Sequence, residues 1–235
     1  MELFDIEALP DTTSETADYA AIDKLLEKLE EISPQAKDNA EHALLYGYSD
    51  HSPAKAPLAA IKHYVQNVFA AAESTGNVHT EDARRLAQQA SSDRLDPDAA
   101  QVIAASYKVI REFDRLRGLL RFKPEPPDCY IARCAPDHFV LPLLADHFWQ
   151  RFGNQSWAII DDRRKLVLTG KNGKRPVLRQ MDAKEKNQMA DQENDEWEGL
   201  WKNYHHSINN EDRANPKLQK QFMPGRYWKY LTEFK

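Results

Sequence analysis

The chain has 235 residues, of which 41% are hydrophobic and 29% are charged, a composition that excludes an intrinsically disordered protein and permits a folded core without disulfides or metal ions. The formal net charge of −5 is unevenly distributed: residues 1–107 contain eight Lys or Arg and nineteen Asp or Glu, whereas residues 108–235 contain twenty-four and eighteen. This asymmetry, −11 against +6, favours either a polyanionic partner for the basic half or electrostatic docking of one half on the other.

Met1–Ala20 has no basic region followed by an apolar run, and no later stretch approaches the roughly 18 apolar residues that a membrane span needs. We therefore expect a cytoplasmic protein that does not contact the membrane. Cys129 and Cys134 are separated by four residues that include β-branched Ile131, so a disulfide between them would close a very short loop. Reduced thiols are the expected state.

The first half of the chain shows apolar residues at helical spacing, which predicts an all-helical layer after a polar lead at residues 1–14. The expected helices cover residues 14–32, 34–46, 53–74, 80–90 and 96–116. Ser52 is the expected N-cap of the third helix, with Pro53 at its first position, and Thr80 begins the fourth helix. We interpret residues 15–117 as one acidic helical region.

At Gly118 the pattern changes from helical to extended, with one further helix expected over residues 139–152. The expected strands cover residues 119–123, 129–133, 156–160, 165–169 and 176–180. The Asn172-Gly173 pair is a strong hairpin signal between the last two strands. The predicted fold class is α+β: an N-terminal helical layer followed by a small antiparallel sheet with covering helices.

The last fifty residues contain a charged helix, expected over residues 183–208, and a tail at residues 215–234 that is rich in aromatic side chains. So aromatic a segment is expected to dock on the protein, with Phe222 and Trp228 in the core and Arg226 on the surface. Residues 118–235 are thus a basic α+β region, which we expect to form one compact unit with the helices.

Basic residues are concentrated on the expected sheet and its hairpins: Arg115, Arg117, Arg121, Lys123, Arg151, Arg163, Arg164, Lys165, Lys171, Lys174, Arg175 and Arg179. Cations on exposed strands, with aromatic rings nearby, are typical of surfaces that follow a phosphate backbone. A solvated sheet face that docks on the acidic half would have the same composition. The candidate nucleic-acid-binding residues are Arg117, Arg121, Arg151, Arg163, Arg164, Lys174 and Arg226.

No motif indicates catalysis or a cofactor, and we expect no cofactor. Cys129, Cys134, His138 and His147 form a string whose spacing is too wide for a typical zinc site, so we expect no metal and interpret His147 as a partly buried hydrogen-bonding residue. Asp161 precedes a second Asp, but adjacent residues of a strand face opposite sides, which favours a turn with local ion pairs over a carboxylate pair. The weak catalytic candidates are His138, His147 and Asp161.

Several blocks of the second half occur in a recognisable order: Glu112–Phe122, Pro136–Phe152, Trp157–Arg164, Leu200–Tyr204 and Asn215–Lys229. Together they resemble a bacterial family of unknown biochemistry that is associated with DNA metabolism and found beside a radical-SAM protein or fused to a uracil-DNA glycosylase-like domain. The resemblance covers most of residues 108–235, is loose over residues 35–107, and does not include Met1–Ala20. It implies a role in DNA repair or modification, with either protein as a possible partner.

The leading hypothesis is therefore a nucleic-acid-associated accessory protein in DNA metabolism, non-catalytic and acting with an enzyme partner. One alternative is a protein-interaction module whose acidic helices bind a partner protein. A second alternative is an enzyme with its site at the junction of helices and sheet.

Overall fold

The structure is a computed structural model, and it describes residues 15–47, 56–125, 128–171, 173–182, 196–209 and 213–234. The expected polar lead, the expected cap Ser52-Pro53 and residues 183–195 of the expected charged helix lie outside the described residues. The chain divides into two compact units, with the boundary between Glu112 and Phe113 and with Asp137–Val140 belonging to the first. We call them the helical unit and the sheet unit.

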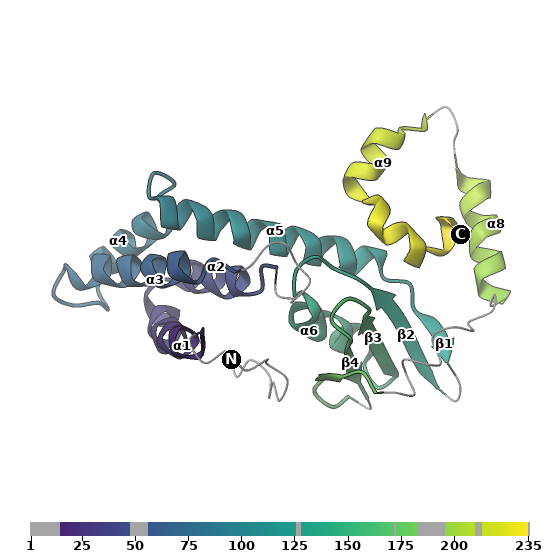
Figure 1. The fold of residues 1–235 in the computed structure, drawn as a ribbon, viewed down its shortest axis with the longest axis horizontal. Helices are drawn as coiled ribbons and strands as arrows, with labels where there is room; N and C mark the ends of the chain where they lie inside the picture. The colour runs from purple at the N-terminus through teal and green to yellow at the C-terminus, as the bar shows by residue number, and fades with distance from the viewer. Residues whose placement is uncertain are drawn as a thin grey trace. The chain divides into compact units, whose positions relative to one another are not determined.

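The helical unit confirms the predicted helical layer (Figure 1). Its helices are α1 (Glu15–Ile32), α2 (Pro34–Leu44), α3 (Leu58–Glu73), α4 (Glu81–Ser92) and α5 (Pro97–Leu119), the last of which continues into the sheet unit. Ser33 and Thr80 cap α2 and α4 by accepting hydrogen bonds from the backbone N–H groups of Ala36 and Ala83. Periodicity and capping together therefore locate most of these helices.

Two helix boundaries of the helical unit differ from the expectation by three or more residues. Helix α3 begins at Leu58, five residues later than expected, with Pro57 at the N-cap position. Helix α5 extends to Leu119, through Gly118, because a glycine in the last turn of a helix costs little. The strand expected at residues 119–123 is accordingly displaced toward Lys123.

The core of the helical unit is formed by apolar side chains at the predicted helical spacing, among them Leu26, Leu29, Ile61 and Val65. Tyr64 is buried with them, and its hydroxyl group donates a hydrogen bond to the carbonyl oxygen of Ser91 at 3.2 Å. The buried polar atom is thereby satisfied, so the tyrosine packs in the core without a desolvation penalty.

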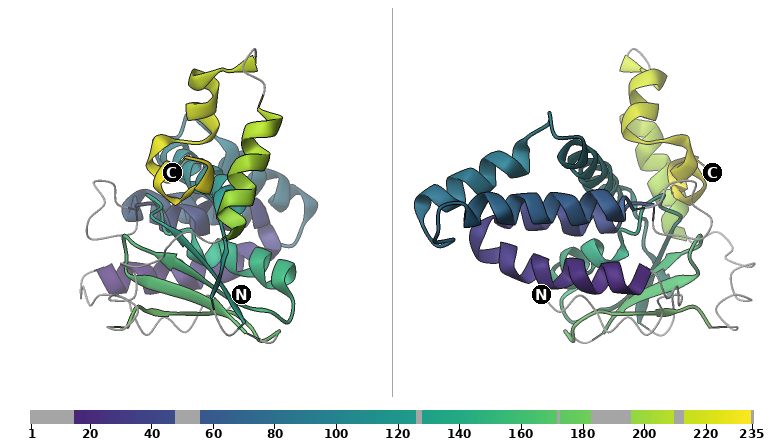
Figure 2. Two further views of the ribbon diagram at one scale, coloured as in Figure 1. Left: turned by 90° about the vertical axis from the view of Figure 1, so that its right-hand side faces the viewer. Right: turned by 60° about the vertical axis from the view of Figure 1, so that its left-hand side comes forward.

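The sheet unit contains one five-stranded sheet within the described residues, and the order of its strands follows the sequence (Figures 1 and 2). The strands are β1 (Lys123–Glu125), β2 (Cys129–Cys134), β3 (Ser156–Asp161), β4 (Leu166–Gly170) and β5 (Val177–Gln180). The α+β class is confirmed. The sheet is mixed, however, because β2 and β3 pair in parallel, whereas the sequence predicted an antiparallel sheet.

The parallel pair has a simple cause. Helix α6 (Leu141–Phe152) connects β2 to β3 and carries the chain back to the end of the sheet where β2 began. A helical crossover of this length is what two parallel neighbouring strands require, whereas hairpins connect the antiparallel pairs β3–β4 and β4–β5.

Helix α6 packs on one face of the sheet through aromatic rings. Phe152 stacks on Trp157 of β3 with 6.0 Å between ring centroids, and Phe122 lies 4.7 Å from Phe152. The opposite face carries a smaller apolar cluster that includes Ile160 and Val167. Both faces of β3 and β4 are therefore covered, in agreement with the burial of nearly every residue in these two strands.

The C-terminal segment forms α8 (Glu196–Ile208), α9 (Pro216–Phe222) and two 3₁₀ turns, η3 (Gly225–Tyr230) and η4 (Thr232–Phe234). Tyr227 and Leu231 are buried, and Trp228 stacks on Phe234 at 4.6 Å, so the tail is docked as predicted. The prediction for Phe222 was wrong, because its side chain is 61% exposed. None of the described helices combines the length and apolarity needed to span a bilayer.

Candidate nucleic-acid interface

The β4–β5 hairpin has a tight turn in which a glycine adopts a left-handed backbone conformation. Gly173 has a φ of +68°, in the left-handed region, and the N–H of Lys174 donates to the carbonyl oxygen of Lys171 at 2.9 Å. The neighbouring Asn172 lies outside the described residues, but the hairpin that the Asn-Gly pair predicts is confirmed by the pairing of β4 with β5.

Two contacts attach this turn to the body of the sheet unit. The indole N–H of Trp149, on α6, donates to the carbonyl oxygen of Gly173 at 3.0 Å. At the base of the hairpin, Gly170 lies directly under the ring of Trp157, where an added Cβ would be only 2.4 Å from the indole. The turn is thus held by a hydrogen bond at its tip and by close packing at its base.

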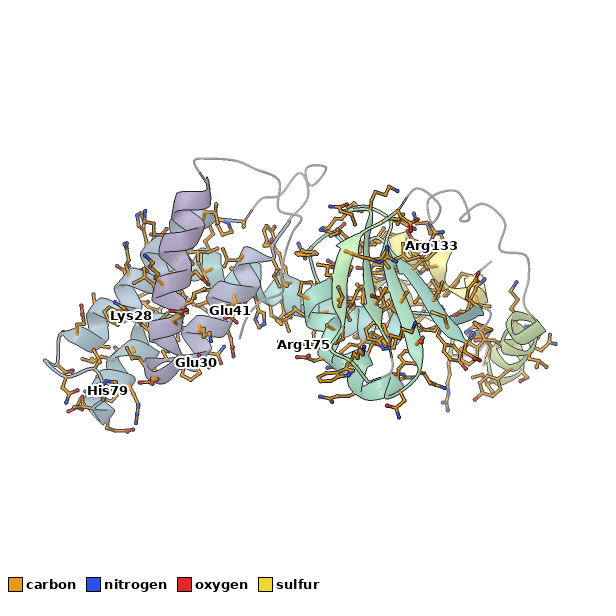
Figure 3. The ribbon with its side chains drawn as sticks, turned by 90° about the horizontal axis from the view of Figure 1, so that it is seen from below. Lys28, Glu30, Glu41, His79, Arg133 and Arg175 are labelled. Carbon is orange, nitrogen blue, oxygen red and sulfur yellow. The ribbon has the colours of Figure 1, made fainter. Side chains whose placement is uncertain are left out.

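Four cations lie on and beside the attached turn. Lys171, Lys174 and Arg175 are exposed on the turn itself, and Arg151 is exposed in the last turn of α6, two residues after Trp149. None of the four forms an ion pair with a residue that the structure describes. We call Arg151, Lys171, Lys174 and Arg175 the basic hairpin surface; Figure 3 shows Arg175 at the end of the sheet away from Arg133.

Arg164, a predicted nucleic-acid contact, has a structural role instead. Its side chain is 4% exposed, and its guanidinium donates to the fully buried carboxylate of Asp161 at 2.8 Å and to the carbonyl oxygen of Pro136 at 3.1 Å. Asp161 also accepts hydrogen bonds from the backbone N–H groups of Arg163 and Arg164. Burial raises the pKa of the Asp161 carboxyl group, and the charge and the hydrogen bonds of Arg164 only partly oppose this rise. The predicted turn with local ion pairs is confirmed.

Arg121, a second predicted contact, forms a bidentate ion pair with Glu233. The distances from its Nε and Nη2 atoms to the carboxylate oxygens are 3.3 and 2.7 Å, and the side chain of Glu233 is only 3% exposed. The same carboxylate accepts the indole N–H of Trp201 at 3.1 Å. Arg121 therefore connects the chain after α5 to the C-terminal segment rather than presenting all its donors to solvent.

The other predicted cations are more accessible. Arg117 lies 3.9 Å from the carboxylate of Asp114, and its side chain is 45% exposed. Arg226 lies on the surface, where it bonds the hydroxyl oxygen of Tyr227 at 2.9 Å. Arg163 is partly exposed beside the buried Asp161 turn. These residues occupy separate places, whereas Arg151 and Lys174 both belong to the basic hairpin surface.

The two histidine candidates lie in different units. His138, in the helical unit, accepts a hydrogen bond from the N–H of Gly47 at 3.1 Å through Nδ1 and stacks on Tyr46 at 4.6 Å. His147 is partly buried on α6, as predicted, but its Nε2 atom is buried without a hydrogen-bond partner among the described residues. Burial and then the charges of Arg117 and Arg151 lower the pKa of His147.

A polar cluster that the sequence did not predict lies around Asp162, which directly follows β3. Asp162 accepts hydrogen bonds from Arg133 at 2.5 Å and from the hydroxyl group of Tyr230 at 2.8 Å. Burial, followed by the hydrogen bond to Asp162, raises the pKa of Tyr230. The one feature of the sequence that indicated this cluster is the adjacency of Asp161 and Asp162, because adjacent residues of a strand face opposite sides. Among the described residues, no group of three or more His, Cys, Asp and Glu side chains has the arrangement of a metal site.

A family model described as a domain of unknown function, DUF4130, matches residues 60–233, which includes the whole described sheet and much of the helical unit. Neither the curated proteins nor the solved structures contain a match to the chain. Because the family model covers most of its length, this chain belongs to the DUF4130 family.

Proposed function

We propose that the sheet unit binds nucleic acid through the basic hairpin surface, and that the protein acts on DNA as an accessory factor beside an enzyme partner. The observation that carries the proposal is the set of four exposed cations, Arg151, Lys171, Lys174 and Arg175, on a turn that Trp149 attaches to α6.

Among the described residues, none of these four cations has a carboxylate partner, and this supports a polyanionic ligand. Arg133 of the same sheet, by contrast, is paired with Asp162. Cations without such a partner can release counterions from a phosphate backbone when they bind it, and this release supplies much of the affinity for nucleic acid. Such contacts fix the position of a strand but carry no sequence information. The proposal is therefore binding with little sequence preference.

Exposure and pairing decide which candidate residues the proposal retains. Arg151 and Lys174 remain in the proposed surface, joined by Lys171 and Arg175. Arg164 leaves it because its side chain is buried against Asp161. The proposed partner, a radical-SAM or uracil-DNA glycosylase-like protein, rests on the resemblance alone.

A second proposal concerns the helical unit, which contains most of the acidic excess of the chain. Leu95 and Tyr107, which are 93% and 62% exposed, are the large side chains that we propose a protein partner covers. Replacing both with serine should remove a stoichiometric protein partner from a native pull-down and leave nucleic-acid binding unchanged. Retention of that partner by the double variant would contradict this second proposal.

Fluorescence anisotropy with labelled 20-nucleotide single strands and 20-base-pair duplexes tests the first proposal on the full chain. Binding should weaken steeply between low and moderate salt, because each contacted phosphate contributes about 0.7 to 0.9 to the slope of log K against log salt concentration. Absence of binding to both probes at low salt would contradict the proposal.

A further inference from the structure

Helix α8 presents aromatic rings to solvent. Trp201 is 39% exposed and Tyr204 is 54% exposed, and their ring centroids are 5.7 Å apart on the same face of the helix. Residues separated by three positions share a helix face, so the two rings form one continuous aromatic surface. We call Trp201 and Tyr204 the aromatic platform.

Two contacts hold the ring of Trp201 in place. Its indole N–H donates to Glu233 at 3.1 Å, and the guanidinium carbon of Arg121 lies 5.8 Å from the ring centroid. The Arg121–Glu233 ion pair thus fixes an aromatic side chain that is still 39% exposed. A ring that is ordered before binding loses less conformational entropy when a ligand stacks on it.

The charges around the platform favour an anionic ligand. The sequences of α8, α9 and the two 3₁₀ turns contain three carboxylates, Glu196, Glu198 and Glu233, and Glu233 is paired with Arg121. The same segments contain five cations: Lys202, Lys217, Lys220, Arg226 and Lys229. An acidic ligand with flat apolar parts fits both the rings and the cations.

We infer that the aromatic platform stacks unpaired bases of a single-stranded nucleic acid while the cations of α8 and α9 contact its phosphates. This inference rests on the proposed nucleic-acid function and specifies its substrate class. Stacking on aromatic side chains tolerates any base, since every base has a flat π-face, and in a duplex these faces are occupied by neighbouring base pairs. Exposed Phe222 on α9 adds a third ring to the same C-terminal segment.

Binding of bases gives a reason for the exposure of large aromatic side chains, which is otherwise unfavourable. Trp, Tyr and Phe side chains bury large apolar areas when they pack inside a protein, yet this segment leaves three of them open next to lysines. In this inference Arg121 is a positioning residue: it acts through Glu233 and Trp201 and does not itself touch a base.

Binding of three labelled probes to the full chain tests the inference: a 20-nucleotide oligothymidine, a 20-nucleotide deoxyribose-phosphate chain without bases, and a 20-base-pair duplex. Trp201→Ala should weaken oligothymidine binding by about 5- to 150-fold, the range that alanine substitution gives for one stacked base. Tyr204→Ala should act in the same direction. Binding of the base-free chain and of the duplex should change by less than about twofold, because no base stacks there.

Two further variants separate stacking from folding. Trp201→Phe retains a ring but loses the N–H that Glu233 accepts, so it should lose less affinity for oligothymidine than Trp201→Ala does. Tyr107→Ala removes an exposed ring from the helical unit and is the matched control, with no expected effect on any probe. Thermal unfolding of each variant shows whether the fold is retained.

The outcomes distinguish this inference from the proposed function. If the wild-type chain binds duplex and oligothymidine but Trp201→Ala changes neither, the platform inference is wrong and the proposed function stands. An equal loss of affinity for oligothymidine and the base-free chain would also overturn stacking. If Trp201→Ala instead converts a dimer to a monomer in sedimentation without changing oligothymidine affinity, the platform is a protein interface. If no probe binds to the wild-type chain, both proposals fail.

Discussion

The indole N–H of Trp149 donates a hydrogen bond to the carbonyl oxygen of Gly173, with 3.0 Å between Nε1 and the oxygen atom. This bond connects α6 to the tip of the β4–β5 hairpin across 24 residues of sequence. It places the exposed Arg151 of α6 next to a turn that carries Lys171, Lys174 and Arg175. The proposed function depends on this juxtaposition.

Trp149→Phe keeps an aromatic ring on α6 but removes the N–H that Gly173 accepts. We expect the free energy of unfolding to fall by about 0.5 to 1.5 kcal/mol, the usual net contribution of one hydrogen bond. The amide protons of the hairpin should exchange faster with deuterium, while those of the helical unit should not. Unchanged exchange in the hairpin would show that the bond does not hold the turn.

Gly170→Ala tests the close packing at the base of the hairpin. The added Cβ would lie 2.4 Å from the Trp157 ring, which has no room to retreat because it is fully buried under α6. We expect a loss of about 1 to 3 kcal/mol in urea unfolding, as overpacked cores show. Gly118→Ala is the control: nothing lies within 4 Å of its added Cβ, and α5 is helical there, so stability should stay equal or rise. Equal behaviour of the two variants would contradict the packing argument.

Asp161→Ala would leave the buried guanidinium of Arg164 without its carboxylate. Removing one partner of a buried pair typically costs about 3 to 5 kcal/mol, so this variant should be among the least stable single substitutions in the sheet unit. Asp114→Ala breaks the exposed pair with Arg117 and should cost less than about 1 kcal/mol. Urea unfolding of both variants measures the difference. A mild Asp161→Ala phenotype would mean that water replaces the carboxylate.

The pH dependence of stability should report on Glu233. Burial raises the pKa of this carboxyl group, but the hydrogen bonds and charge of Arg121 and the Trp201 N–H outweigh burial, and the net pKa lies below its usual 4.5. Because the folded pKa is the lower one, the stabilisation is fully present above about pH 4.5 and is lost as the pH falls through the folded pKa.

Glu233→Gln should therefore flatten the fall in stability below that pH and destabilise the protein at neutral pH. The exposed Glu73, replaced by Gln, is the matched control for loss of one carboxylate. Thermal unfolding from pH 3 to 7 follows both variants. If stability fell as steeply toward acidic pH in Glu233→Gln as in the wild type, the assignment of this fall to Glu233 would be contradicted.

Local sequence patterns predicted most of the elements, because helix periodicity, N-caps and the Asn-Gly turn are encoded within a few residues. The parallel pairing of β2 with β3 was not predicted, since it depends on how α6 packs and not on the strands themselves. Mixed and antiparallel sheets contain strands of similar composition.

The candidate site was predicted as a set of charges but not as an arrangement. The sequence shows that Arg121 is basic, but not that it meets a glutamate 112 positions away. For the same reason, buried Arg164 and exposed Lys174 are indistinguishable in the sequence. The Asp161-Asp162 turn, whose ion pair is local, was predicted, since a pairing over three positions is visible from the chain alone.

The central claim is that the basic hairpin surface contacts phosphates, and the salt dependence of duplex binding tests it most directly. A variant with Lys171, Lys174 and Arg175 all replaced by Gln should lose up to about 2.7 from the slope of log K against log salt concentration, about 0.9 for each phosphate contact removed. The control replaces three exposed arginines of the helical unit, Arg84, Arg85 and Arg94, by Gln and should keep the wild-type slope. A hairpin variant with the wild-type slope and affinity, or an equal loss in the control, would contradict the account.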